Sequence, residues 1–333
     1  MPNPKSNIAL QGKSLQLGYL HKGAKKEILS NLNFELYSGE LTCLLGPNGV
    51  GKSTLIKAIL GQIHPWKGEL LLQGSPISTY SLEELALRLA VVLTEPVFPG
   101  NMTVEQLVAL GRTPHTGWSG RLQEKDREAV ENAISRTKIG YLTKERLSEI
   151  SDGQRQKTMI ARAIAQDGEV ILLDEPTAHL DLVNRFEIMQ LLREIAIEEQ
   201  KAILVVTHDL EIGVETADKF WLMTCGNPLV SGSPEDLILS GKINQLLPSK
   251  KYFYSAKRGR LEMEEDALEL SIQGSEEWVY WVKKAFRKAK ITQVPSMILV
   301  KENPFSLEMD SRTFASLEEI IQFLQNYSKD PNF

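Results

Sequence analysis

The clearest structural signal in the chain is Gly46-Pro-Asn-Gly-Val-Gly-Lys-Ser-Thr54. It has the glycine, lysine and hydroxyl spacing of a phosphate-binding loop, with an apolar run at Leu41–Leu45 before it and a helical pattern from Gly51 onward. Glycines let backbone N–H groups turn inward around phosphate oxygens, and the N-terminus of the next helix adds partial positive charge. We therefore expect a strand, a loop and a helix that together bind the phosphates of a nucleotide.

The residues of this loop have different expected roles. Lys52 would reach the β and γ phosphates of ATP, Ser53 would supply a hydroxyl to Mg²⁺, and Thr54 would make a further phosphate contact. The remaining loop residues would surround the phosphates: Gly46, Pro47, Asn48, Gly49, Val50 and Gly51.

A second signal is the run Val170-Ile-Leu-Leu-Asp-Glu-Pro176, in which four apolar residues are followed by two acids. A strand of this kind sits in the centre of a sheet and delivers its carboxylates at the edge where ligands bind. Asp174 is then expected to hold the Mg²⁺ shell, and Glu175 to polarise an attacking water. Acids that end a strand are often only helix caps, so this interpretation depends on the phosphate loop.

Short apolar runs between turns predict buried strands, with helical patterns between them. This alternation implies the α/β class of fold, with a parallel sheet covered on both faces. Together with the phosphate loop, it is typical of a P-loop NTPase. We also expect an antiparallel β layer ahead of the sheet, with a turn at 22–26, and a helical insertion over about 100–148. The predicted strands are 14–17, 28–36, 41–45, 91–93, 170–173 and 203–206, and the predicted helices begin at 51 and cover 154–165 and 185–197.

Between the loop and the acid strand, Ile150-Ser-Asp-Gly-Gln-Arg-Gln156 heads a helix and resembles the signature of ABC ATPases, usually written LSGGQ. A helix that opens with Ser151 and Gly153 offers a hydroxyl and free N–H groups to an anion. The order of phosphate loop, signature, acid strand and later histidine resembles the ABC ATPase family over residues 14–240. The resemblance implies that two chains sandwich two ATP molecules, with Ser151, Gly153 and Gln154 meeting the γ phosphate that the other subunit holds.

The same resemblance implies roles for three more residues. Asp181, which ends Pro176-Thr-Ala-His-Leu-Asp181, matches the loop that crosses the dimer interface. His208 matches the switch histidine that contacts the γ phosphate, although a lone histidine at a strand end is more often only a satisfied polar residue. Tyr19 matches the aromatic residue that stacks on adenine, with an ordinary packed tyrosine as the alternative.

Two residues depart from the family pattern. Asp152 stands where glycine is usual, which places a carboxylate beside a phosphate-binding surface and could slow or tune closure by repulsion. Glu95, or else Thr94, stands where the family has a glutamine that ligates Mg²⁺ and couples to the permease. A carboxylate oxygen can also bind Mg²⁺, so Glu95 is expected as a metal ligand.

Composition narrows the class of partner. A net charge of -5 gives no broad attraction to a phosphate backbone, so nucleic acid is not expected as a partner. Cys43 and Cys225 lie in or beside apolar runs and are expected to be buried, reduced thiols. No window approaches the roughly 18 apolar residues needed to cross a bilayer, so we expect a soluble chain that reaches a membrane only through a partner.

We expect an ABC ATPase domain over 1–245, with a helical subdomain at about 96–168, and a small accessory α/β domain over 250–333. Residues 250–260 read as a linker or an edge hairpin, and a strand at 297–300, a second near 305–309 and a helix at 317–327 follow. The pattern of the first helix in this tail indicates one packed face and a solvated basic face opposite it. We favour this interpretation over a helix that lies on a membrane surface. The residues expected on its packed face are Trp278, Trp281, Val282, Ala285, Phe286 and Ala289.

The segment 101–115 resembles the importer subgroup that energises uptake of iron siderophores, haem or cobalamin. That resemblance, with no fused membrane domain, implies a homodimer that binds transmembrane permease subunits at the cytoplasmic face of the inner membrane and serves a substrate-binding protein indirectly. Two alternatives stay open. They are a soluble ABC protein that acts on DNA repair, chromosomes or ribosomes, and an isolated ATP-dependent regulator.

Overall fold

The computed structural model describes residues 7–21, 24–93, 101–117, 120–249, 251–263 and 270–327. The chain divides into two compact units, Met1–Glu262 and Met263–Phe333. Among the described residues, buried apolar side chains form two clusters in the first unit and a separate one in the second.

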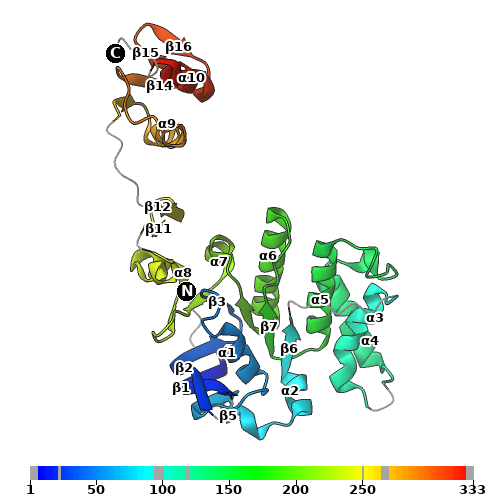
Figure 1. The fold of residues 1–333 in the computed structure, drawn as a ribbon. Coiled ribbons are helices and arrows are strands. Elements are labelled where there is room, and N and C mark those ends of the chain that lie inside the picture. Colours follow the sequence, from blue (N-terminus) through cyan, green and yellow to red (C-terminus); the bar gives the residue numbers. More distant parts are fainter. Residues whose placement is uncertain are drawn as a thin grey trace. The chain divides into compact units, whose positions relative to one another are not determined.

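A six-stranded sheet forms the centre of the first unit, and five neighbouring strands in it are parallel (Figure 1). Alternate residues of its central strands enter different cores, since Cys43 belongs to one apolar cluster and Leu44 to the other. Both faces are therefore covered, which confirms the predicted α/β class and explains the unbroken apolar runs. In spatial order the strands are β10 (Val230–Gly232), β9 (Lys219–Leu222), β3 (Leu41–Leu45), β8 (Ala202–Val206), β7 (Val170–Asp174) and β6 (Leu89–Val92).

The edge strand β6 begins two residues earlier than the predicted 91–93 and ends at Val92. It pairs with β7 from Leu89 to Val92, opposite the buried residues of that strand. Leu93 lies beyond this pairing and is 46% exposed. The prediction was wrong here because an apolar residue after the end of a strand continues the hydrophobic pattern without joining the ladder.

The predicted antiparallel layer is a separate four-stranded sheet. Its two long strands pair with several register shifts. These shifts interrupt the alternation of apolar and polar residues, so the sequence pattern predicts shorter strands than the structure has. Phe34 packs against Trp221 with ring centroids 4.6 Å apart, and this contact joins the layer to the central sheet. The strands in spatial order are β2 (Ala24–Tyr37), β1 (Ile8–His21), β4 (Lys67–Leu72) and β5 (Ser75–Pro76).

Helices cover the central sheet, and α3 and α4 lie beside α5 at the end of the unit away from β1 and β2 (Figure 1). This group is the expected helical insertion, and its described residues contain no strand. The α-helices of the first unit are α1 (Lys52–Ile59), α2 (Leu82–Arg88), α3 (Val104–Ala109), α4 (Glu124–Arg136), α5 (Asp152–Ala165), α6 (Leu182–Glu199), α7 (Leu210–Thr216) and α8 (Pro234–Leu239). Short 3₁₀ turns are η1 (Ile77–Thr79), η2 (Leu110–His115), η3 (Gly140–Leu142) and η4 (Lys242–Leu246).

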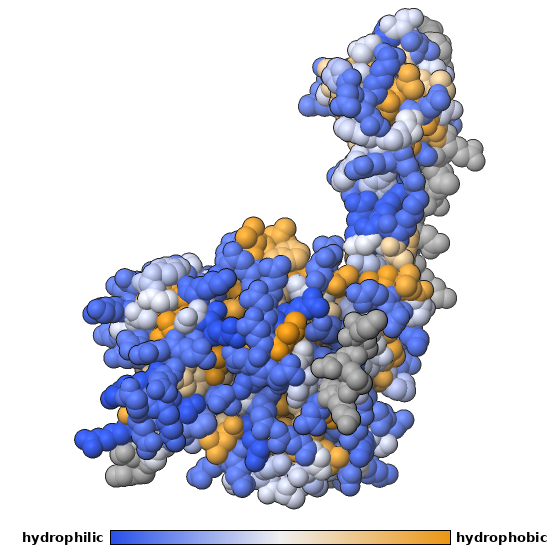
Figure 2. Space-filling model, turned by 180° about the vertical axis from the view of Figure 1, so that it is seen from behind, coloured by the Kyte–Doolittle hydropathy of each residue, from blue (hydrophilic) through white to orange (hydrophobic). Residues whose placement is uncertain are grey.

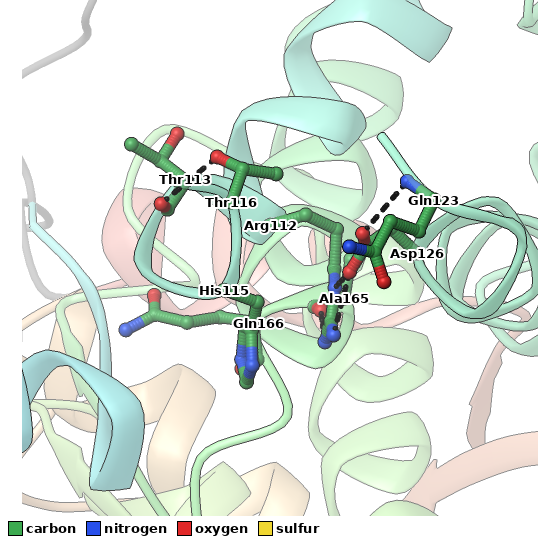
Figure 3. A network of polar contacts seen from close by, with 8 residues as sticks. All are labelled: Arg112, Thr113, His115, Thr116, Gln123, Asp126, Ala165 and Gln166. Atoms are coloured by element: carbon green, nitrogen blue, oxygen red, sulfur yellow. Dashed lines mark hydrogen bonds and ion pairs between the residues drawn. The ribbon is translucent and has the colours of Figure 1, made fainter. Parts of the chain in front are cut away.

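A buried polar network fastens the insertion to α5 (Figure 3). Arg112 lies 2.9 Å from the Asp126 carboxylate and donates to the Ala165 carbonyl at 2.8 Å. The two charged side chains are 6% and 1% exposed. The Gln123 backbone N–H and then Arg112 hold the pKa of Asp126 below its usual range. The pair satisfies charges that would otherwise be costly to bury, so it fixes how η2 and α4 sit against α5.

The residues after η4 form a hairpin of β11 (Tyr252–Ser255) and β12 (Arg260–Met263), one of the two expected alternatives. Tyr254 is buried in the core of the first unit, and its backbone N–H donates to the Asn244 side chain at 2.7 Å. These contacts attach the hairpin to the first unit, so the division between units falls later than the boundary expected near residue 250.

Over its described residues, the second unit has a four-stranded sheet and two helices. Trp278, Val282 and Phe286 form its packed stripe on α9, and Trp278 stacks on Phe305 with centroids 5.1 Å apart. Trp281 is 47% exposed, so the prediction that it lies on the packed face was wrong. The packed stripe follows steps of four residues along the helix, and Trp281 lies at its margin. The elements are β13 (Ile272–Gln273), α9 (Glu276–Lys288), β14 (Ile298–Glu302), β15 (Phe305–Met309), β16 (Arg312–Phe314) and α10 (Leu317–Tyr327).

The two cysteines differ in their surroundings. Cys43 is buried in β3, and burial raises the pKa of its thiol. Cys225 is exposed, which corrects the expectation of two buried thiols, because it lies in the turn after β9 and not in the strand.

The face drawn in Figure 2 is largely hydrophilic, with hydrophobic residues in separate patches. Within the described residues, no helix has the length and apolar character required to cross a bilayer.

Candidate functional site

The register of the central sheet brings three strand ends to one edge. Leu44 of β3 and Asp174 of β7 both lie opposite Val206 of β8. The phosphate loop follows β3, the acid pair ends β7, and His208 follows β8, so the three predicted motifs leave the sheet at the same level.

The phosphate loop needs glycine where the chain turns into α1. Gly51 has φ +112°, and a Cβ there would lie 2.7 Å from the Leu29 side chain. Within the loop, the Lys52 ammonium donates to the Gly46 carbonyl at 2.5 Å and to the Pro47 carbonyl at 3.2 Å. Partial burial lowers the pKa of Lys52, while the nearby acids act in the opposite direction. The loop therefore curls around its own lysine.

A cavity of about 340 Å³ opens beside this loop. It unites the two motifs that the sequence placed far apart, because residues of the loop and both acids line it. Its lining also includes Ile28 of β2, which belongs to none of the sequence motifs. The lining residues are Ile28, Asn48, Gly49, Gly51, Lys52, Ser53, Thr54, Asp174 and Glu175.

Glu175 occupies a left-handed backbone conformation with φ +52°, which costs a non-glycine residue about 1–3 kcal/mol. Its backbone N–H donates to the Val206 carbonyl at 2.8 Å, and its carbonyl accepts from the Ala178 N–H at 3.1 Å. These bonds hold the residue in place despite the strain. The His208 Nδ1 atom lies 2.9 Å from the Glu175 carboxylate, and the histidine side chain is 75% exposed. The two residues expected to act together are therefore in direct contact.

Tyr19 lies close to the end of the loop. Its hydroxyl is 3.3 Å from the Thr54 hydroxyl, and the Lys57 ammonium is 5.8 Å from its ring centroid. The tyrosine is only half-buried, so part of it remains available beside the site.

The signature residues lie at the N-terminus of α5. The Ser151 side chain accepts from the Gln154 N–H at 3.3 Å, and the Gln154 side chain accepts from the Ser151 N–H at 2.9 Å, which forms a capping box. Gly153 is buried beneath Asn184, whose side-chain oxygen would lie 3.2 Å from a Cβ at this position.

Asp181 caps α6 and connects to the same place. Its carboxylate accepts from the Asn184 backbone N–H at 2.9 Å and from the Asn184 side chain at 2.6 Å. The backbone bond first, and then the side-chain bond, hold the pKa of Asp181 below its usual range. Asn184 thus joins Asp181 to the signature helix within one chain.

The predicted site residues fall into two groups. Residues 48, 49, 51–54, 174 and 175 line the cavity, with Tyr19, Gly46, Pro47 and Val50 beside them and His208 joined through Glu175. None of Ser151, Gly153, Gln154 and Asp181 belongs to the described lining of this cavity. Glu95 and Thr94 lie outside the described residues.

Three neighbours of these residues were missed by sequence reasoning: Ile28 in the cavity lining, Asn184 over Gly153, and Arg155, whose Nη1 atom lies 2.6 Å from the Asp152 carboxylate. Only Arg155 gave a signal, because it stands three residues after Asp152 on a predicted helix, a spacing that brings side chains together. Ile28 and Asn184 reach the site through the tertiary fold.

Comparison with known proteins agrees with this geometry. A family model described as ABC transporter matches residues 29–178. An uncharacterized ABC transporter ATP-binding protein of Methanocaldococcus jannaschii is 39% identical over 259 residues, which cover 78% of this chain and 88% of that protein. The ferric enterobactin transport ATP-binding protein FepC of Escherichia coli is 34% identical over 242 residues, covering 73% and 88% respectively.

Among solved structures, cbiO1 from Clostridium perfringens, part of the ABC transporter complex cbiONQ, is 30% identical with a TM-score of 0.63. The match covers 73% of this chain and 96% of that one. The phosphate loop, the acid-bearing strand and the extent of these similarities lead to one conclusion: the chain belongs to the ATP-binding proteins of ABC transporters.

Proposed function

We propose that this chain binds and hydrolyses ATP to energise an ABC importer for an iron chelate such as a siderophore, or for haem or a cobalamin-type substrate. One observation carries the ATPase part of the proposal. Lys52, Asp174 and Glu175 come from motifs far apart in the sequence and line one cavity.

The site residues have complementary roles in this proposal. Lys52 and the loop N–H groups bind the β and γ phosphates, and Thr54 adds a hydroxyl. Tyr19 stacks on adenine. Glu175 accepts a proton from the attacking water or orients it, and His208, which contacts Glu175, holds that carboxylate and the γ phosphate in place.

Ser53 and Asp174 would hold Mg²⁺, with Glu95 as a further ligand. The hydroxyl and the carboxylate line the same cavity, and hard oxygen donors of this kind suit Mg²⁺. When bound, the ion supplies positive charge that offsets the charge on the phosphate oxygens.

The signature residues Ser151, Gly153 and Gln154 would complete the site of a second copy, and Asp181 would cross the same interface. Their separation from the cavity within one chain supports this arrangement, because a surface apart from the pocket can serve the pocket of a partner. ATP then closes a homodimer, and hydrolysis reopens it.

The substrate class is supported by a relative named for ferric enterobactin transport, which matches most of the first unit. The importer role places the chain at the cytoplasmic face of the inner membrane, bound to permease subunits through the helical insertion. A substrate-binding protein would act on the other side of those permeases.

The test is to tag the chain in its native cell, solubilise the membranes gently with ATP present, and identify the proteins that co-purify. The proposal expects a polytopic permease, whose own binding protein then points to the substrate. The matched control is Lys52→Ala, which should recover less permease if ATP drives the complex. Recovery of only ribosomal, DNA-bound or soluble partners would overturn the importer role and leave a dimeric ATPase.

A further inference from the structure

Asp152 places a negative charge in the first turn of α5, where a phosphate group would bind in the proposed dimer. The structure pairs this carboxylate within its own helix. Its Oδ1 atom lies 2.6 Å from the Arg155 Nη1 atom, one turn further along. The repulsion expected from the sequence is therefore opposed by a cation three residues away.

Arg155 is held from a second direction. Its other terminal nitrogen donates to the Ile150 carbonyl at 3.2 Å and to the Leu147 carbonyl at 3.4 Å, both in the loop before the helix. The arginine is 25% exposed, whereas Asp152 is 65% exposed. The less exposed arginine is thus held by two backbone carbonyls, and it binds the more exposed carboxylate from one turn further along the helix.

As a contribution to folding, such a pair is weak, because water and salt screen exposed charges. The situation changes when a partner subunit covers the helix end and excludes water, since charge interactions strengthen as the local dielectric constant falls. An unpaired carboxylate would then repel phosphate oxygens, whereas a paired one carries no net charge to the interface.

We propose that Arg155 is a positioning residue that neutralises Asp152 and so keeps the N-terminus of α5 able to accept the γ phosphate bound by the partner subunit. The inference rests on the proposed function, and it makes the importance of Arg155 depend on residue 152. A purely structural role through the Leu147 and Ile150 carbonyls would not depend on residue 152.

The experiment measures the ATP concentration that gives half-maximal dimerisation of the full chain by sedimentation velocity. All proteins carry Glu175→Gln so that the dimer accumulates. Arg155→Gln should raise this concentration about tenfold when residue 152 is Asp and less than about twofold when it is Gly. Asp152→Gly alone should lie within about twofold of the parent, because it removes a carboxylate whose charge Arg155 already offsets.

Two variants separate charge from fold. Arg155→Lys keeps the charge but loses the fork of donors, so it should stay within about threefold of the parent if charge matters. Lys157→Gln removes another cation from the same helix, one that pairs with Glu187 at 2.7 Å, and should shift the concentration equally in both residue-152 backgrounds. Monomer melting temperatures and monomer ATP affinities should change little across the set.

Equal effects of Arg155→Gln in the two backgrounds, or no effect when residue 152 is Asp, would overturn the inference while leaving the dimeric ATPase intact. An Arg155→Lys chain that behaves like Arg155→Gln would overturn it as well. Absence of an ATP-dependent dimer in every variant would instead overturn the proposed function and this inference together.

Discussion

Two helices of the first unit begin where a phosphate could bind, and they treat the positive end of the helix differently. At α1, Lys52 and the phosphate loop line one cavity together with Asp174 and Glu175, all within one chain. At α5, the first turn is capped by its own side chains, and its one acid is paired internally. The α1 end is a pocket that already holds both the cation and the acids. The α5 end is a surface, and in the proposed function it binds phosphate only when a second subunit covers it.

The largest expected effect tests the pocket. Lys52→Ala removes the cation at the loop and should weaken ATP binding to the monomer by about 100-fold or more, since charge-assisted bonds to phosphate are lost. Equilibrium binding of a fluorescent ATP analogue checks this. The matched control is Lys57→Ala on the same helix, whose ammonium faces the Tyr19 ring and should matter far less. Unchanged ATP affinity in Lys52→Ala would show that Lys52 does not bind the phosphates, and the contrast drawn between α1 and α5 would be wrong.

A smaller effect tests the support behind α5. Arg112→Met leaves the buried Asp126 carboxylate without its cation and should lower the melting temperature by roughly 5–10 °C. The ATP affinity of the monomer should stay within about twofold, because the network lies at the far end of α5 from the signature. Calorimetry and nucleotide binding on the same preparation check both parts. If Arg112→Met weakened ATP binding as much as Lys52→Ala, the packing behind α5 would affect the pocket at α1, and the two regions would not be independent.

Gly153→Ala should have a moderate effect that is confined to the dimer. The added Cβ would meet the Asn184 side chain at 3.2 Å, so we expect ATP turnover to fall about tenfold with little change in monomer binding. A second change, Asn184→Ala, should restore most of the turnover by making room. Failure of this rescue would mean that the residues do not oppose each other through contact.

The smallest effect concerns the N-terminus of α6, where the Asp181 carboxylate caps the helix. Because the folded-state pKa of Asp181 is lowered, its contribution to stability is full above the unfolded pKa of about 3.9 and is lost as pH falls through the folded value. The melting temperature of the parent should exceed that of Asp181→Asn by about 1–2 °C at pH 6, and the difference should vanish in acid. A difference that persists in strong acid would point to a cause other than charge.

Much of the first unit could be predicted because its signals are local. The strand at Leu41–Leu45 matched the sequence pattern residue for residue, and the acid strand was correct to within one residue. Both are buried on two faces and followed by residues whose types the turn or the chemistry requires. Sequence alone therefore predicts that the phosphate loop and the acid pair are neighbours, and the cavity that they both line agrees with this.

What escaped prediction depends on contacts between distant segments. Arg112 meets Asp126 and Ala165 only once three helices have packed, and Asn184 meets Gly153 across two helix ends. The left-handed conformation of Glu175 also has no sequence signal, since most glutamates that follow a strand do not adopt it. This conformation is held by one bond to β8 and one from the Ala178 N–H in the turn that follows, contacts that periodicity does not describe.

The most direct test of the central claim is a phosphate-release assay on the purified chain and on Glu175→Gln, each with ATP and Mg²⁺, combined with ATP binding on the same samples. The account predicts saturable hydrolysis by the parent, turnover lower by about 100-fold or more in the variant, and unchanged ATP binding by that variant. Rapid turnover by Glu175→Gln would contradict the assignment of this cavity as the hydrolytic site.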